Sequence, residues 1–334
     1  MTGTMPKDRF GREIDYLRIS VTDHCNLRCV YCMPLRGLSF APSDELLTAA
    51  EIELVARAAV EVGFRKFRLT GGEPTLRPDL VDIVRRIAAV PGVQDVAMTT
   101  NAILLPRLAV PLKEAGLRRL NIHLDTLHPE RLKKLMRFGT LQEIEAGIAA
   151  AEAAGLLPIK INCVVTRDYN DMDAVDLARR ALESGWHVRF IELMPLGAGE
   201  MAHVALSQFV PSAETRARIE GELGRLVPVP GGNPSDESRN YRFVSGGDGV
   251  VGFISPVSEP YCGTCNRMRL TADGKFHLCL LNDDEMDVKR AIRSGGGLEA
   301  VAAILGKAVL AKPTGHRLEE GVSTEERAMF QIGG

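Results

Sequence analysis

The sequence predicts an α/β fold: a partial (β/α)6 TIM-type barrel followed by a smaller C-terminal β-containing domain. Six short runs rich in β-forming residues alternate with longer segments of helical periodicity. This alternation is typical of a parallel sheet with right-handed crossovers, and six units predict a partial or complete barrel. After about residue 210 the alternation stops, and short strands separated by turn residues follow. We therefore assign residues 1–210 to the barrel and residues 211–334 to the second domain.

The expected elements follow from these patterns. The six barrel strands are expected at residues 16–22, 66–70, 96–100, 120–124, 159–165 and 188–194. Two intervening helices begin with a capping box, Thr48 with Glu51 and Thr140 with Glu143. In the second domain we expect a helix at 212–223, strands near 241–244, 251–254, 267–271 and 275–280, and helices near 288–293 and 298–310.

Polar and apolar residues alternate along the expected strands. Because side chains two residues apart share a face, the apolar face should lie under the helices and the polar face should line the barrel. The polar face comprises Arg18, Ser20, Thr22, Arg68, Thr70, Asn121, His123, Asp125, Lys160 and Asn162. Buried cations need partners, so this lumen is expected to hold an anionic ligand. The alternative is an open sheet with a wet polar face, which is unusual for parallel strands. Arg189 and Met194 differ in parity, which leaves open how both would reach one cavity.

Three cysteines with the spacing C-x3-C-x2-C follow the first expected strand: Cys25, Cys29 and Cys32. Thiolates suit iron–sulfur clusters, and three of them leave one iron of a 4Fe-4S cluster without a protein ligand. The alternative is a structural zinc site, which favours C-x2-C pairs and four protein ligands. The pattern favours the open cluster.

A second group of three cysteines lies in the C-terminal domain: Cys262, Cys265 and Cys279. A hairpin turn at residues 273–274 is expected to bring Cys279 back toward the other two. Here the residues leave zinc and a cluster equally open, because His277 is available as a fourth zinc ligand. The seventh cysteine, Cys163, lies in an apolar run and is expected to pack in the core.

Composition narrows the class of protein. The 334 residues are 45% hydrophobic and carry a formal net charge of -2, which argues against broad nucleic-acid binding. Residues 1–13 lack the apolar core of a signal peptide, and no apolar run reaches membrane-spanning length. We expect a cytoplasmic protein with no membrane partner, whose cysteines are reduced and serve metal binding or catalysis.

The first cysteine loop, with Tyr31 just before its last cysteine, resembles the shared loop of the radical S-adenosylmethionine (SAM) enzymes. Nearly the whole chain resembles the GTP 3',8-cyclase family of molybdenum cofactor biosynthesis. The matching stretches are residues 16–23, 68–74, 99–101, 189–192, Cys262 with residues 265–267, and Gly333-Gly334. Their order along the chain makes the resemblance specific.

The resemblance implies two 4Fe-4S clusters, one on each cysteine triad, with SAM on the first and the guanine of GTP on the second. It implies cofactor contacts at Tyr31, Gly72, Met194 and the strand-four position held by His123, where the family usually has serine. Contacts to GTP are implied at Arg18, Lys66, Arg68, Thr99, Lys160, Arg189, Arg267 and Arg269. Catalytic roles are implied for Arg267, Arg269 and the tail residues Gly333 and Gly334. Ala102 stands where the family usually has glycine.

The implied reaction is the conversion of GTP to 3',8-cyclo-7,8-dihydro-GTP. A 5'-deoxyadenosyl radical abstracts the C3' hydrogen, and the resulting carbon radical attacks guanine C8. Implied partners are an electron donor such as flavodoxin or ferredoxin, the downstream cyclic pyranopterin monophosphate synthase, and a second copy in a homodimer. The competing functions are a peptide-modifying radical SAM enzyme with an auxiliary cluster, and a non-catalytic zinc or electron-transfer protein.

Overall fold

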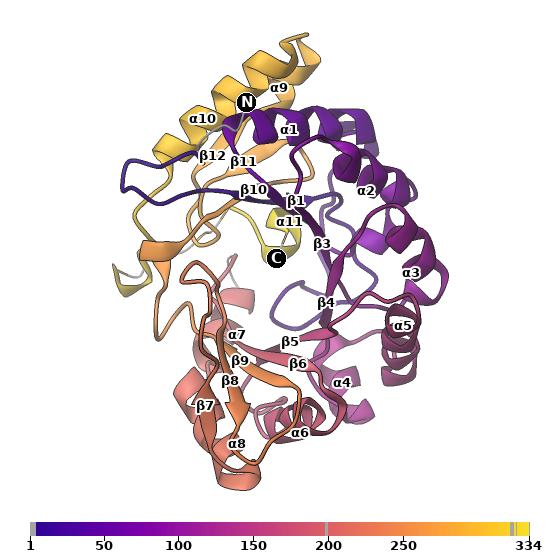
Figure 1. Cartoon of the computed structure of the whole chain (residues 1–334), viewed down its shortest axis with the longest axis vertical. Helices are drawn as coiled ribbons and strands as arrows, with labels where there is room; N and C mark the ends of the chain where they lie inside the picture. Colours follow the sequence, from indigo (N-terminus) through magenta and orange to yellow (C-terminus); the bar gives the residue numbers. More distant parts are fainter. Residues whose placement is uncertain (1–4, 198–199, 321–323, 325, 334) are drawn as a thin grey trace.

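The computed structural model describes residues 5–197, 200–320, 324 and 326–333. Within these residues one sheet runs in the order β12-β11-β10-β1-β2-β3-β4-β5-β6-β9-β8-β7. Its parallel strands are β10 (Arg267–Leu270), β1 (Tyr16–Ser20), β2 (Lys66–Thr70), β3 (Asp95–Thr100), β4 (Arg119–His123), β5 (Lys160–Val165), β6 (His187–Glu192) and β9 (Val250–Ile254). The sheet curves around a central space without closing (Figure 1). The predicted α/β partial barrel is confirmed.

Helices cover the outer side of the curve (Figure 1). They are α1 (Ala49–Val62), α2 (Leu80–Ala89), α3 (Leu105–Glu114), α4 (Pro129–Met136), α5 (Leu141–Ala153), α6 (Ala174–Ser184) and α8 (Ser212–Leu223). Both predicted capping boxes form, with Glu51 N donating to Thr48 Oγ1 at 3.2 Å and Glu143 N donating to Thr140 Oγ1 at 3.3 Å. Further along the chain, α7 (Glu200–Ser207) follows β6, and α9 (Lys289–Arg293) and α10 (Gly297–Ala311) lie beside α1.

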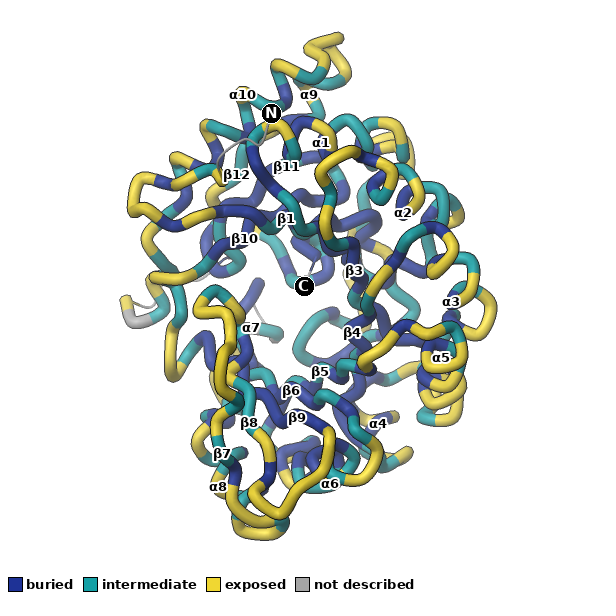
Figure 2. The backbone as a smooth tube through the Cα atoms, viewed as in Figure 1, coloured by how far each residue is buried: buried dark blue, intermediate teal, exposed yellow. Residues whose placement is uncertain are grey.

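The alternation along the strands separates a core from a lumen. Leu17, Ile19, Phe67, Leu69 and Ile122 are fully buried and belong to the main hydrophobic core. Figure 2 shows the strands as the buried layer and the outer turns of the helices as exposed. The polar residues between them point into the barrel, as the strand pattern predicted.

The C-terminal segment extends the barrel at both edges. Strand β9 pairs with β6 and strand β10 pairs with β1, so both run parallel to the barrel strands. Antiparallel strands complete the two ends: β11 (Lys275–His277) and β12 (Glu285–Asp287) beyond β10, and β8 (Arg239–Phe243) and β7 (Leu226–Pro228) beyond β9. The last helix, α11 (Met329–Ile332), lies inside the curve of the sheet (Figure 1). Residues after 210 therefore share one sheet with the barrel.

No helix in the described part of the chain combines the length and apolar character needed to cross a membrane.

Candidate active site

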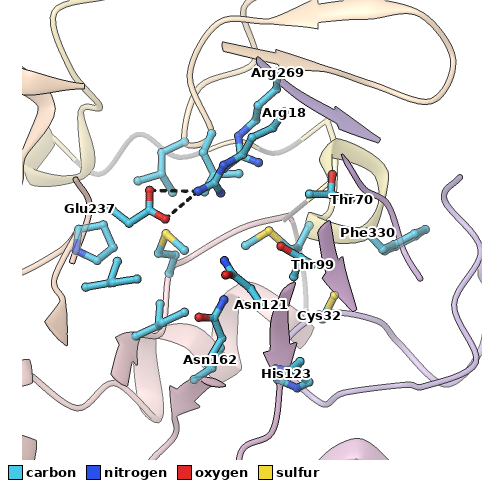
Figure 3. A pocket seen from close by; sticks show the side chains of 18 of the residues that line it. Arg18, Cys32, Thr70, Thr99, Asn121, His123, Asn162, Glu237, Arg269 and Phe330 are labelled. Carbon is cyan, nitrogen blue, oxygen red and sulfur yellow. Dashed lines mark hydrogen bonds and ion pairs between the residues drawn. The ribbon is translucent and has the colours of Figure 1, made fainter. Parts of the chain in front are cut away.

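Both cysteine triads line one cavity of about 300 Å³. Figure 3 shows part of its lining, with Cys32 of the first triad labelled. The barrel contributes residues of its strands, with Thr70 and His123 at the carboxyl ends of β2 and β4 and Thr99, Asn121 and Asn162 within β3, β4 and β5. The C-terminal segment closes the other side with Arg267, Arg269, and residues of α11. The loops after the parallel strands thus meet the second cysteine group across the cavity, where barrel folds place their active sites.

The first triad lies on the loop between β1 and α1. Turn hydrogen bonds shape it, because the amides of Cys32 and Met33 both donate to the carbonyl oxygen of Cys29, at 2.9 and 3.0 Å. Burial raises the pKa of the Cys25 and Cys29 thiols to about 11 and that of Cys32 to about 12. These buried sulfurs therefore become ligands only when a metal supplies positive charge.

Gly72 is required by a close approach to this loop. A Cβ atom at residue 72 would lie 2.3 Å from the carbonyl oxygen of His24 and 2.6 Å from that of Asp23. The Gly72 amide also donates to the carbonyl oxygen of Thr22 at 2.7 Å. The backbone after β2 is thereby held against the backbone that carries the cysteines.

His123 belongs to a hydrogen-bonded group beside the first triad. Tyr31 Oη donates to Asp125 Oδ2 at 2.6 Å, and His123 Nε2 lies 3.0 Å from Tyr31 Oη and 3.1 Å from Asp125 Oδ2. His123 Nε2 also lies 3.9 Å from Cys29 Sγ. Burial opposes a charge on the imidazole, but the Asp125 carboxylate outweighs it and raises the pKa of His123 well above its ordinary value. The structure therefore places His123 against both Tyr31 and a cysteine of the triad.

The second triad faces the cavity from the opposite side. Cys262 and Cys265 belong to a tight turn, and Cys279 follows β11. Burial raises the pKa of the Cys265 thiol, but the charges of Lys312 and Arg267 outweigh this effect and lower the pKa to about 7. Burial also raises the pKa of the Cys262 thiol, but hydrogen bonds with His316, which sequence analysis did not single out, outweigh burial and lower that pKa.

His277, the proposed fourth zinc ligand, does not line the cavity. It is fully buried, and its Nδ1 atom lies 3.2 Å from Glu285 Oε1. β11 ends at His277, and Cys279, two residues later, lines the cavity while His277 does not, so His277 is not placed as a fourth ligand of this triad.

Sulfur spacing also separates the two metal alternatives. Sulfurs around a tetrahedral zinc ion lie about 3.8 Å apart, given Zn–S bonds of about 2.3 Å. Among the described residues, the one set of three or more His, Cys, Asp or Glu ligand atoms within 4.8 Å of one another is His128, Asp173 and Asp176. The three sulfurs of each triad therefore do not all lie within 4.8 Å of one another, a wider spacing than that around a zinc ion and one compatible with three corners of a 4Fe-4S cluster.

A group of cations lies deeper in the barrel. This cation group comprises Arg18, Arg68, Lys160 and Arg189. Arg68 Nη1 and two nitrogens of Arg189, Nε and Nη2, are buried without a hydrogen-bond partner in the described chain. Burial lowers the pKa of Arg189 to about 10 and that of Lys160 to about 8. Unpartnered buried cations are costly, so this site requires an anion.

Arg189 and Met194 differ in parity, and the structure explains this difference because the two residues lie at different depths in the barrel. Arg68, Lys160 and Arg189 each stand two residues before a cavity-lining residue, Thr70, Asn162 and Ile191. Met194 lines the cavity from the loop after β6. Lys66 does not line the cavity, and nor do Arg68, Lys160 and Arg189. Lys66 begins β2 and forms an ion pair with Asp15 at 2.9 Å.

Sequence analysis also missed two carboxylates that line the cavity, Glu73, which is buried, and Glu237, which is partly buried. Glu73 accepts hydrogen bonds from Thr100 Oγ1 and Asn101 N, both at 2.7 Å, and so connects β2 with β3. The position of Glu73 shortly after the second expected strand could have identified it as a site residue. Glu237 accepts from Arg18, and its loop of Gly, Pro and Ser gave no signal.

The C-terminal tail enters the cavity through Met329 and Phe330. Gly333 follows them, and its carbonyl oxygen accepts a hydrogen bond from Arg269 Nη1. Gly334 lies outside the described residues. Ala102 does not line the cavity. It adopts a positive φ of 68°, a conformation that glycine takes more freely.

Comparison with known proteins places these features in a family context. Residues 19–181 match the profile of the Radical SAM superfamily, and residues 186–318 match Molybdenum Cofactor Synthesis C. The chain is 46% identical over 328 residues to GTP 3',8-cyclase from Moorella thermoacetica, covering 98% of this chain and 100% of the relative. It is 42% identical over 339 residues to GTP 3',8-cyclase from Listeria monocytogenes, covering 98% and 99%.

A solved structure supports the fold. Streptococcus suis SuiB bound to S-adenosylmethionine is similar with a TM-score of 0.57 at 14% identity. The match covers 83% of this chain and 64% of that chain.

Proposed function

This chain belongs to the GTP 3',8-cyclase family of radical SAM enzymes, and from that premise we propose which of its residues carry out the reaction. The enzyme converts GTP to 3',8-cyclo-7,8-dihydro-GTP in the first step of molybdenum cofactor biosynthesis. Its cofactors are two 4Fe-4S clusters and SAM. When bound, these cofactors supply the 5'-deoxyadenosyl radical that removes the C3' hydrogen of GTP.

The two triads hold the two clusters in our proposal. Cys25, Cys29 and Cys32 bind the cluster that takes SAM, and Cys262, Cys265 and Cys279 bind the cluster that takes guanine. In both cases three cysteine sulfurs leave one iron for a substrate or cosubstrate. Tyr31, Gly72, His123 and Met194 contact SAM, since all four line the cavity that the first triad also lines, and Tyr31 lies between two of its cysteines in the sequence.

The cation group receives the triphosphate. Arg18, Arg68 and Arg189 each have a buried nitrogen without a hydrogen-bond partner in the described chain, and phosphate oxygens satisfy such donors well. Lys160, half-buried, adds a further positive charge that acts on the same group through Arg189 and Arg68. Thr99 lines the cavity above them and contacts the nucleotide. Lys66 reaches the triphosphate only if it leaves Asp15, which makes it the weakest of the assigned contacts.

Arg267 and Arg269 act on the guanine side, next to the second triad. Arg267 Nη1 lies 3.9 Å from Cys265 Sγ, and Arg269 holds the tail at Gly333. We assign the tail, Gly333 with Gly334, to excluding water and stray hydrogen donors from the radical.

Residues 1–210 form the SAM-binding unit in this proposal, and residues 211–334 supply the second cluster and the tail. The seven cysteines are unpaired, which suits a reducing cytoplasm. We propose an electron donor of the flavodoxin or ferredoxin type, delivery of product to a cyclic pyranopterin monophosphate synthase, and assembly as a homodimer.

The observation that carries the proposal is the shared cavity: both triads line it, and unpartnered buried cations lie at its base. Anaerobically purified protein should contain about eight irons per chain, four for each cluster. With SAM and a strong reductant, it should form 5'-deoxyadenosine in a GTP-dependent manner. Formation that ignores GTP would remove the substrate assignment, and absence of iron would remove the mechanism.

A further inference from the structure

One carboxylate reaches from the C-terminal segment into the cation group. Glu237 precedes β8, and its side chain is only 14% exposed. Its Oε1 and Oε2 atoms lie 2.9 and 3.0 Å from Arg18 Nη2 (Figure 3). Its Oε2 atom also lies 2.7 Å from Arg267 Nε. This carboxylate therefore bridges the triphosphate side and the guanine side of the cavity.

Glu237 is ionised, but its single carboxylate does not neutralise all the cations around it or accept hydrogen bonds from all their donors. Burial opposes its charge, but the guanidinium groups of Arg267 and Arg18, followed by Arg189 and Arg68, outweigh burial and hold the pKa of Glu237 far below its ordinary value. Arg189 and Arg68 still keep buried nitrogens without hydrogen-bond partners in the described chain. A single negative charge thus faces four guanidinium groups, and a more highly charged anion is favoured there.

The segment that carries Glu237 is attached mainly through the same arginines. Residues 229–236 are mostly exposed and include Gly231-Gly232, where added Cβ atoms would meet nothing within 4 Å. Apart from the Glu237 ion pairs, Arg267 Nη2 donates to the carbonyl oxygen of Ser235 at 2.6 Å. A ligand that engages Arg18 and Arg267 would therefore remove the attachments of residues 233–237.

We propose that Glu237 is an internal counter-anion that occupies the phosphate site of the nucleotide-free chain, sets the affinity for nucleotide, and is displaced by the triphosphate. This inference rests on the proposed function, since the displacing ligand is GTP. The carboxylate partly neutralises the buried cations when no nucleotide is bound. When GTP binds, ion pairs between the arginines and Glu237 are replaced by ion pairs between the arginines and the triphosphate.

Glu237→Gln tests this exchange, because glutamine keeps the shape and removes the charge. Calorimetric titration of the cluster-loaded enzyme with GTP and with inorganic triphosphate should show about tenfold tighter binding in the variant, whereas guanosine should bind unchanged. Glu222→Gln is the matched control: it makes the same change of side chain at an exposed residue of α8 and should have a much smaller effect. The nucleotide-free variant should also melt at a lower temperature, because the cations lose their counter-charge.

Unchanged or weaker triphosphate binding by Glu237→Gln would overturn the proposal, and weaker guanosine binding would show instead that the carboxylate holds guanine. If the variant does not fold, hydrogen exchange of the wild-type enzyme provides an independent test. Amide hydrogen exchange at residues 233–237 should accelerate on saturation with inorganic triphosphate, and unchanged or slower exchange contradicts displacement. If triphosphate produces all these effects but GTP binds neither enzyme, the proposed function fails while the role of Glu237 stands.

Discussion

Arg269 donates a hydrogen bond to the carbonyl oxygen of Gly333, which fastens the C-terminal tail inside the curve of the sheet (Figure 1). Gly333 adopts a φ of 84°, and a Cβ atom there would lie 2.4 Å from Thr70 Oγ1 and 2.8 Å from Ser20 Cβ. Both the backbone conformation and the space thus require glycine. The tail is seated against β1 and β2, at the mouth of the barrel.

Gly333→Ala should therefore displace the tail without unfolding the enzyme. We expect at least a tenfold loss of kcat/KM for GTP, with the melting temperature within a few degrees of wild type. Steady-state kinetics and thermal melting check this. Gly232→Ala is the matched control, since that site is open and should tolerate the methyl group. Equal activity of both variants with wild type would remove the tail from the mechanism.

Arg189→Met should weaken GTP binding and stabilise the nucleotide-free chain. The buried guanidinium has two nitrogens without partners, so an apolar side chain of similar length should raise the free energy of unfolding of the nucleotide-free chain by about 1 kcal/mol or more. Affinity for GTP should fall at least tenfold, because a phosphate ligand is lost. Denaturant unfolding and calorimetry measure the two effects, with the exposed Arg225→Met as control. A variant that binds GTP normally would place the triphosphate elsewhere.

Lys160 should make GTP binding depend on pH. Burial, and then the charges of Arg189 and Arg119, lower the pKa of Lys160 to about 8. Below pH 8 the ammonium is present and pairs with phosphate; above pH 8 the free chain has lost that proton, so binding requires proton uptake and affinity falls as pH rises toward 9. Titration in buffers of different ionisation enthalpy measures the uptake. Lys160→Arg stays charged and should flatten the profile, so an unchanged slope would assign the proton to another group.

His123→Ser should alter SAM binding without loss of the first cluster. Asp125 keeps hydrogen bonds from Tyr31 Oη at 2.6 Å and from the Val164 amide at 2.8 Å, so the local structure should persist. The variant removes a ring that lies 3.9 Å from Cys29 Sγ. We expect the SAM dissociation constant to change by less than tenfold and GTP affinity to stay constant. Loss of iron from the variant would mean that His123 supports the triad itself.

Strand periodicity and cysteine spacing predicted most of this site. The alternation Arg18, Ser20 and Thr70, Asn121, Asn162 placed the lumen correctly, because a parallel strand between helices leaves only one face for polar residues. The pairing of β9 and β10 with the two barrel edges was not predicted, since strand partners far apart in sequence leave no periodic signal. Glu237 was missed for a related reason, because the sequence of an irregular loop has no periodicity from which the positions of its side chains can be predicted.

The most direct test of the account follows the C3' hydrogen. GTP deuterated at C3' is incubated anaerobically with the cluster-loaded enzyme, SAM and reductant, and the 5'-deoxyadenosine formed is analysed by mass spectrometry. Since both triads face one cavity with the cation group at its base, the account predicts transfer of one deuterium per 5'-deoxyadenosine molecule. Unlabelled 5'-deoxyadenosine formed alongside consumed GTP would contradict it.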